Sequence, residues 1–170
     1  MTHSSRDDYN LFAARYDEIF GDRQRDKIIK LTAYVPSPWP EPCLDAGAGT
    51  GIAQRVLEQP FVNVDLSPEM LSYAPEPRVI ADIHQLPFPA QTFGLVLSVS
   101  VIDRTFDLEV VIGELFRVLR PGGYLAVTCL KSEDVAAMEW ALSAQFPAGF
   151  RRVDLGPDIG FVVQRPAPES

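Results

Sequence analysis

The chain has 170 residues, of which 46% are hydrophobic, so it is long and apolar enough to form one globular domain with its own core. Its formal net charge of −8 argues against nucleic acid as a partner, because contacts to a phosphate backbone need clustered Lys and Arg. The apolar runs are too short to span a bilayer, and residues 1–8 lack the apolar core of a secretion signal.

Cysteine and histidine usage indicates a reducing compartment and gives no sign of a metal site. Cys43 and Cys129 are the only cysteines, and both lie within apolar runs. We expect two reduced thiols in the core, with a disulfide or a metal-binding pair as the alternative. His3 and His84 are isolated, so no metal site is predicted. A cytoplasmic location is the expectation from these features.

The N-terminal part of the chain is expected to be helical. Apolar residues recur at helical spacing from about residue 8 to residue 35, with a break expected at Gly21-Asp22. Segment 36–40 holds three prolines and should act as a stiff linker, because each proline fixes φ and removes a backbone donor. We therefore divide this single domain into a helical segment at 1–35, a core at 36–165 and a tail at 166–170.

After the linker, strands alternate with helices. Strands are expected at 42–46, 61–65, 78–81, 93–98 and 124–129, with a closing pair at 150–155 and 160–164. Helices are expected at 52–58, after Ser67 as N-cap, at 108–119 and at 132–146, and Pro121-Gly122-Gly123 should form a turn. This alternation favours a parallel sheet covered on both faces, and the closing pair implies one antiparallel strand near the C-terminus.

The clearest local signal is the glycine-rich segment 44–51, which reads Leu-Asp-Ala-Gly-Ala-Gly-Thr-Gly. It follows a strand and opens a helix, where glycines let the backbone turn tightly and approach a ligand. Its spacing differs from the dinucleotide fingerprint, and it lacks the Lys-Ser/Thr ending of a phosphate-binding loop. A ligand site at the carboxyl end of the first strand is the prediction, and a plain glycine-rich turn is the alternative.

Three aspartates surround the predicted site. Asp45 precedes the glycines, Asp65 ends the second strand and Asp82 follows the third. A carboxylate at the end of the second strand can accept hydrogen bonds from both hydroxyls of a ribose, and Asp82 could accept from an amino group. Three acids together suit a cationic ligand and would repel a pyrophosphate. The alternative is a structural role, for Asp65 as a turn residue before a helix.

Five segments in this order resemble the motifs of the class I S-adenosylmethionine-dependent methyltransferases: 44–51, 64–71, 81–88, 93–99 and 114–123. The resemblance extends from about Tyr9 to Val163 and is specific for the family, though not for a substrate. It implies an α/β fold, Rossmann-like and doubly wound, with a mostly parallel seven-stranded sheet and helices on both faces. It also implies S-adenosylmethionine as the cofactor.

The resemblance assigns parts of the cofactor to particular residues. Asp45 would lie near the methionine ammonium, Gly47 and Gly49 would pack against the methionine part, Ser98 would line the same part and Asp65 would hold the ribose. On the adenine side, Asp82 would meet the amino group and the Ile83 backbone would meet the ring, while Leu66 and Ile83 would sandwich the adenine. His84 falls on that side too and is not expected to act as a base.

The N-terminal segment 9–17 resembles the part that closes over the cofactor in small-molecule methyltransferases. Tyr9, Arg15 and Tyr16 are therefore candidates for a lid, with ordinary helix packing as the alternative. One departure from the family is Gly94, which stands where relatives often have Asp. Another is Ile102-Asp103-Arg104, where many relatives have a segment that contains histidine.

The activity implied is methyl transfer by in-line displacement to a small molecule or an exposed side chain. Asp103 is the candidate general base if the acceptor must lose a proton, and a loop or helix-cap carboxylate is the alternative. Two other functions stay open: an inactive cofactor-binding domain that supports a partner protein, and a nucleotide-dependent oxidoreductase. A homodimer is left open as well.

Overall fold

A seven-stranded sheet forms the centre of the structure, a computed structural model that describes residues 13–133 and 135–167. The strands are β1 (Cys43–Ala46), β2 (Phe61–Asp65), β3 (Arg78–Ile80), β4 (Phe93–Ser98), β5 (Leu119–Leu130), β6 (Arg151–Leu155) and β7 (Asp158–Gln164). The helices are the 3-10 turn η1 (Ala13–Arg15), α2 (Tyr16–Thr32), α3 (Ile52–Leu57), α4 (Pro68–Leu71), α5 (Leu108–Val118) and α6 (Val135–Gln145). In these two ranges, no helix is long and apolar enough to cross a membrane.

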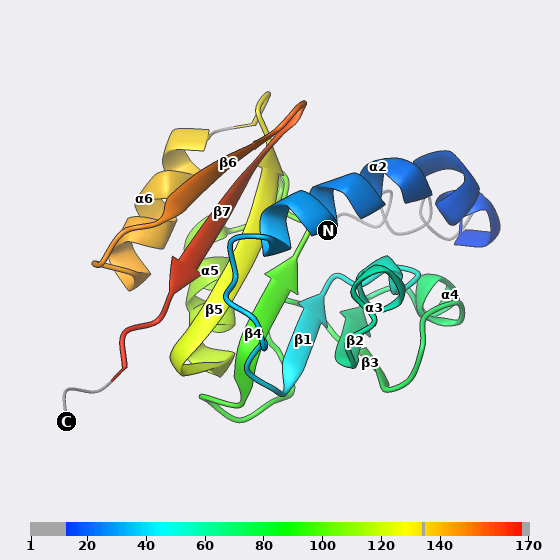
Figure 1. The fold of residues 1–170 in the computed structure, drawn as a ribbon, viewed down its shortest axis with the longest axis horizontal. Coiled ribbons are helices and arrows are strands. Elements are labelled where there is room, and N and C mark those ends of the chain that lie inside the picture. The colour runs from blue at the N-terminus through cyan, green and yellow to red at the C-terminus, as the bar shows by residue number, and fades with distance from the viewer. Residues whose placement is uncertain (1–12, 134, 168–170) are drawn as a thin grey trace.

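The strand order is β3-β2-β1-β4-β5-β7-β6, and β7 runs antiparallel to both of its neighbours (Figure 1). The other neighbouring pairs are parallel, as where Cys43 of β1 lies opposite Phe61 of β2 and Leu95 of β4. This arrangement confirms the predicted α/β fold with one antiparallel strand near the C-terminus. It also brings the carboxyl ends of β1, β2 and β4 to one edge of the sheet.

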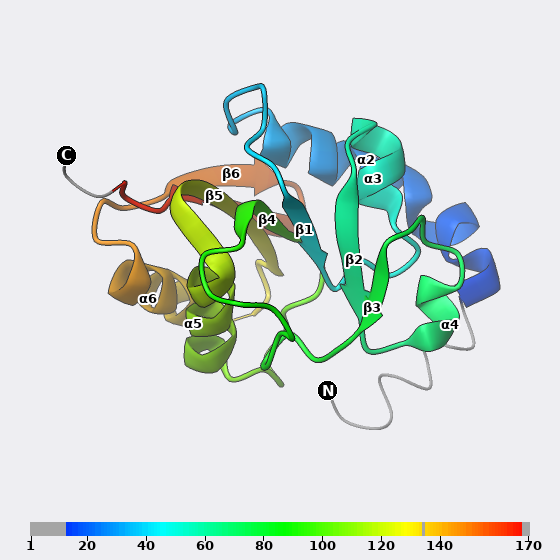
Figure 2. The same ribbon diagram turned by 90° about the horizontal axis from the view of Figure 1, so that it is seen from below.

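Two apolar layers enclose the sheet, and every residue of β4 is buried. On one face, Ile28 and Leu31 of α2 and Ala53 of α3 pack against the strands. On the other face, α5 and α6 supply a second core that includes Ile112 and Leu142 (Figure 2). Strands covered on both faces contain few polar residues. Polar side chains at the strand ends therefore indicate where a ligand site lies.

Helix α2 is continuous from Tyr16 to Thr32, so the predicted break at Gly21-Asp22 is wrong. A glycine inside a helix costs about 1 kcal/mol relative to alanine. Burial of Ile28 and Leu31 against the sheet offsets that cost, because the C-terminal half of the helix is anchored there. The N-terminal half extends beyond the sheet toward the carboxyl ends of the strands (Figure 1).

The predicted turn at Pro121-Gly122-Gly123 is part of β5 instead, so this prediction is also wrong. Leu119 already pairs with Phe93, and the register between β4 and β5 shifts over the residues that follow. On the side of β7, the irregular stretch keeps its backbone hydrogen bonds, since the Gly122 N–H donates to the Arg165 carbonyl just after β7. The segment is therefore a bulge within a strand, since its backbone groups remain paired.

Two sequence details now have a structural reason. Cys43 and Cys129 are free, buried thiols, as predicted, and burial raises the pKa of each to about 11. Gly94, which departs from the family pattern, lies against the linker, where a Cβ would overlap the Pro40 carbonyl oxygen. No larger residue fits there unless the linker moves.

Candidate functional site

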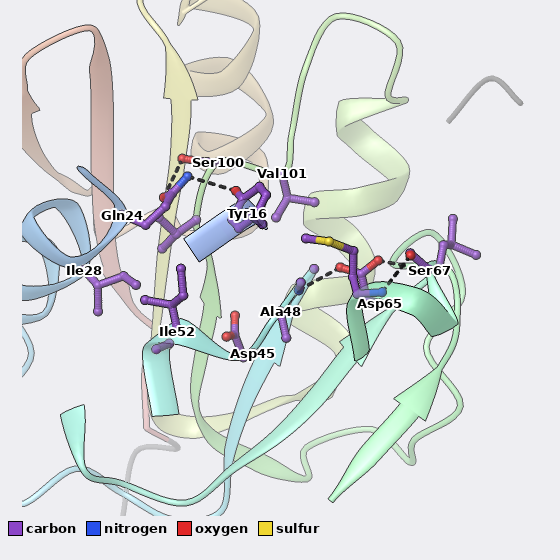
Figure 3. Close-up of a pocket in the computed structure, with 16 residues that line it drawn as sticks. Tyr16, Gln24, Ile28, Asp45, Ala48, Ile52, Asp65, Ser67, Ser100 and Val101 are labelled. Atoms are coloured by element: carbon purple, nitrogen blue, oxygen red, sulfur yellow. Dashed lines mark hydrogen bonds between the residues drawn. The ribbon is translucent and has the colours of Figure 1, made fainter. Parts of the chain in front are cut away.

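A cavity lies at the carboxyl ends of β1, β2 and β4, between the glycine-rich loop and the N-terminal half of α2 (Figure 3). It contains about 720 Å³ of space, part of which is open to solvent. The sequence places Asp45, Gly47, Gly49, Asp65 and Leu66 at a ligand site, and the structure brings all five to this cavity.

Backbone geometry explains the glycines of the loop. Gly47 has φ 84° and Gly49 has φ 55°, conformations that side chains other than glycine rarely adopt. A Cβ on Gly47 would overlap the Val101 side chain, and one on Gly49 would lie 3.1 Å from Met70 Cε. The loop is thus closely packed on the side of the cavity.

Asp65 holds the loop and the start of α4 in place. Its carboxylate accepts from the Gly49 N–H at 2.8 Å and from the Ser67 N–H at 2.9 Å. Burial raises the pKa of Asp65 above its ordinary value, although these backbone hydrogen bonds partly oppose that effect. The same carboxylate lines the cavity, so its remaining lone pairs face the space where a ligand would lie.

Asp45 is the most strongly perturbed group of the site. Burial, with a smaller contribution from the negative charge of Asp65, raises the pKa of Asp45 to about 7. Its carboxylate points into the cavity between Ile52 and Ala48 (Figure 3). A buried carboxylate facing a cavity is stabilised by any cation that enters, so the electrostatics favour a positively charged ligand.

A smaller hollow of about 250 Å³ continues from the loop toward β3. Its lining includes Leu66, Asp82 and Ile83, as the sequence predicts for the adenine side, and also Phe106. The Asp82 carboxylate accepts from the His84 N–H at 2.9 Å and lies 2.6 Å from His84 Nδ1. Burial alone would raise the pKa of Asp82, but these contacts to His84 outweigh it and lower the pKa.

Phe106 has no signal in the sequence, because it lies in an irregular loop after β4. Its ring stacks on the His84 ring with centroids 5.1 Å apart. Phe106 thus forms part of the wall of the hollow and is backed by the His84 ring.

Ser98 lies in a different place from the one expected. Side chains alternate along β4, so Leu97 and Val99 face the α2 side, where the cavity is, while Ser98 faces the opposite side. Ser98 is fully buried, and its hydroxyl has no hydrogen-bond partner in the described part of the chain. At the end of β4, the residues that line the cavity are instead the three that follow Ser98, namely Val99, Ser100 and Val101.

A second cavity of about 760 Å³ adjoins the first. The two share four lining residues: Tyr16, Gln24, Ser100 and Val101. Tyr16 was expected near the site as a lid candidate, and here it belongs to the common wall. Arg15 points elsewhere, with a side chain that is 74% exposed and paired with Glu18. Tyr9 lies outside the described residues.

Polar side chains run along the common wall in a connected chain. Lys27 Nζ donates to Ser100 Oγ at 2.9 Å and forms an ion pair with Asp158. Ser100 Oγ donates to Gln24 Oε1 at 3.1 Å, and Gln24 Nε2 donates to Tyr16 OH at 3.3 Å (Figure 3). No motif in the sequence predicts this network, although Lys27 lies four residues before buried Leu31 and thus on the same face of the helix.

Asp103, the candidate base, lines the second cavity. Its Oδ1 accepts from the Thr105 N–H at 2.8 Å and from the Thr105 hydroxyl at 2.6 Å. These bonds give it the arrangement of an ordinary turn-forming carboxylate, which is the alternative reading of this residue. No general base is otherwise evident among the residues that line the second cavity in the described ranges.

Comparison with known proteins gives consistent results. Residues 44–127 match the family model of a methyltransferase domain. A malonyl-[acyl-carrier protein] O-methyltransferase of Dechloromonas aromatica is 37% identical over 132 residues, which cover 74% of this chain and 50% of the relative. The chain thus spans about half the length of that curated relative.

Solved structures share the fold at low sequence identity. A chain of the complex between the Haloferax volcanii Trm112 methyltransferase activator and a methyltransferase has a TM-score of 0.79 and 19% identity, covering 97% of this chain and 99% of that one. The Burkholderia thailandensis 1,6-didemethyltoxoflavin-N1-methyltransferase, solved with S-adenosylhomocysteine, has a TM-score of 0.65 and 18% identity, covering 95% and 87%.

Proposed function

This chain belongs to the class I S-adenosylmethionine-dependent methyltransferases, and we propose that it transfers the cofactor's methyl group to an oxygen of a small acid or acyl thioester. The pair of adjoining cavities is the observation that carries the proposal, because they share Tyr16, Gln24, Ser100 and Val101. A donor in the first cavity and an acceptor in the second would meet at this common wall. Holding the two reactants in that relation can lower the activation barrier by about 7 kcal/mol or more.

The residues of the first cavity fit the cofactor. The Asp45 carboxylate can pair with the methionine ammonium, and Asp65 can accept from the ribose hydroxyls with lone pairs that Gly49 and Ser67 leave unused. Gly47 allows the chain to approach the ligand closely. When bound, the cofactor supplies an activated methyl group, and the electron pair of the broken carbon–sulfur bond stays on sulfur.

The hollow toward β3 fits the adenine ring. Leu66, Ile83 and Phe106 offer apolar contacts, and Asp82 can accept from the exocyclic amino group. Because His84 holds the Asp82 carboxylate at 2.6 Å, that acceptor is oriented before the ligand arrives.

An oxygen acceptor agrees with the chemistry of the second cavity. The relative that is 37% identical is named an O-methyltransferase of malonyl-[acyl-carrier protein]. A carboxylate is already an anionic nucleophile at neutral pH, so it needs no general base. Asp103, which is committed to Thr105, is then not required for proton removal.

A domain that binds the cofactor but depends on a partner protein is the second candidate. It is favoured by the structural likeness to a chain of the Trm112 complex. A partner would then supply whatever covers or completes the acceptor side.

Methyl transfer by the purified chain separates the two candidates. The chain is incubated with S-adenosylmethionine and a malonyl thioester, a primary amine or a phenol, and S-adenosylhomocysteine and methylated product are quantified by mass spectrometry. We expect the methyl ester, and Gly49→Val as matched control should form none. Cofactor binding without transfer to any acceptor would favour the partner-dependent domain, and transfer to the amine alone would contradict an oxygen acceptor.

A further inference from the structure

A buried ion pair stands in the wall of the second cavity. Lys27 is 7% exposed and Asp158 is 1% exposed, and both line that cavity. Removing two charges from water is costly, and an apolar pair of similar volume often stabilises a fold as well or better. The pair therefore calls for a reason other than stability.

Lys27 has hydrogen-bonding capacity left over. An ammonium carries three donors. One serves Asp158 and one serves Ser100 Oγ, and in the described ranges no other acceptor lies within hydrogen-bonding distance of Nζ. The remaining donor is available to a group that enters the cavity.

The charges around the cavity leave one cation without a counterion. Asp158 is committed to Lys27, and Asp103 accepts two hydrogen bonds from Thr105. Arg23 lies one helical turn before Lys27 and lines the same cavity, yet it makes no ion pair within the described part of the chain. The two cations and two carboxylates that line the cavity sum to zero, and Arg23 is the cation that no carboxylate contacts.

Ser100 connects Lys27 to the first cavity, because it accepts from Lys27 Nζ and lines that cavity. Its backbone has φ 59°, which is uncommon for a residue other than glycine, and its N–H donates to Thr128 Oγ1 at 2.7 Å. Backbone strain of this kind persists only where surrounding contacts enforce it, and it concentrates at functional sites. The strained turn places the Ser100 hydroxyl, which is part of the common wall, between Lys27 Nζ and Gln24 Oε1.

We propose that Lys27, held by Asp158 and Ser100, binds the acceptor's carboxylate together with Arg23. This inference rests on the proposed function and names the residues that select an anionic acceptor. A carboxylate has two oxygens, so one can accept from Lys27 while the other faces the common wall and the methyl donor. Arg23, at the exposed side of the cavity, strengthens the attraction, because its planar donors match a carboxylate.

The test measures binding by calorimetry on protein saturated with S-adenosylhomocysteine. The probes are the malonyl thioester of N-acetylcysteamine and its methyl ester, which lacks the charge. A double variant, Lys27→Met with Asp158→Leu, removes both charges, so that neither is left buried alone. Arg23→Gln is the second variant, and Lys30→Met, an exposed cation of the same helix, is the control.

We expect the wild type and Lys30→Met to bind the acid at least about tenfold more tightly than the ester. The double variant should lose this preference while its affinity for S-adenosylhomocysteine changes less than about twofold, and Arg23→Gln should reduce the preference in part. A double variant that keeps the preference, or a wild type that binds acid and ester equally or neither, overturns the proposal. Failure of the wild type to bind S-adenosylhomocysteine would instead refute the proposed function.

Discussion

Asp45→Asn should change stability and cofactor affinity in opposite directions. The pKa of Asp45 is about 7 in the folded chain, because the carboxylate is buried beside Asp65, whereas an unperturbed aspartate has a pKa of about 3.9. The folded state therefore holds this proton more strongly than the unfolded state does. Its stabilising effect is present at low pH and is lost as the pH rises from about 4 to about 7.

The size of the effect follows from the pKa difference. Each pKa unit corresponds to about 1.4 kcal/mol, so the titration of Asp45 should cost the folded wild type about 2 kcal/mol between pH 5.5 and pH 8. Asparagine does not titrate. The free energy of unfolding of Asp45→Asn should accordingly rise by about 2 kcal/mol relative to the wild type over this interval.

Urea unfolding at pH 5.5 and pH 8, followed by circular dichroism without cofactor, measures this difference. Asp22→Asn, which alters an exposed carboxylate of α2, is the control and should track the wild type. At pH 8 the Asp45→Asn variant should also bind S-adenosylhomocysteine at least about tenfold more weakly, because it lacks the charge that pairs with the ammonium. Parallel pH dependences in all three proteins, or unchanged affinity, would refute the reasoning.

Three further results are expected. Asp65→Ala should weaken S-adenosylhomocysteine binding at least about tenfold in calorimetry, because it removes the ribose acceptor and the anchor of the Gly49 N–H; an unchanged dissociation constant would mean that the ribose lies elsewhere. Gly49→Val should abolish cofactor binding, because φ 55° and Met70 leave no room for a branched side chain, while circular dichroism should show an intact fold; a variant with normal affinity would disprove this packing argument. Residues 13–20 should exchange amide hydrogens faster without ligand than with S-adenosylhomocysteine, whereas residues 28–32 should be protected in both states; equal, strong protection of 13–20 would mean that the start of α2 is a fixed wall, as the bonds of Asp17 to Thr50 and Arg55 allow.

Periodicity and turn chemistry were sufficient to predict most of the fold. Ser67 caps α4 as predicted, by accepting from the Met70 N–H at 3.0 Å, because N-capping depends on neighbouring residues alone. The break expected at Gly21 is absent for the opposite reason. Packing of Ile28 and Leu31 on the sheet overrides a weak local preference, and no local pattern contains that information.

Within the site, the glycine loop and the aspartates of β1 and β2 could be predicted to line the cavity, whereas Ser100 and the Lys27–Asp158 pair could not. Ser98 was expected to line the cavity, but the alternation of β4 directs it to the other face and leaves Ser100 at the wall. The partners Lys27 and Asp158 are far apart in sequence and meet only because α2 packs against β6 and β7. Such a pair becomes visible only in three dimensions.

Calorimetric titration of the purified chain with S-adenosylhomocysteine, and separately with NADH, tests the central claim most directly. We predict one S-adenosylhomocysteine site per chain and no heat of binding with NADH, because Asp45 can pair with the ligand's ammonium, Asp65 can accept from its ribose hydroxyls, and both carboxylates disfavour a pyrophosphate. Saturable binding of NADH without binding of S-adenosylhomocysteine would contradict the assignment of the cavity.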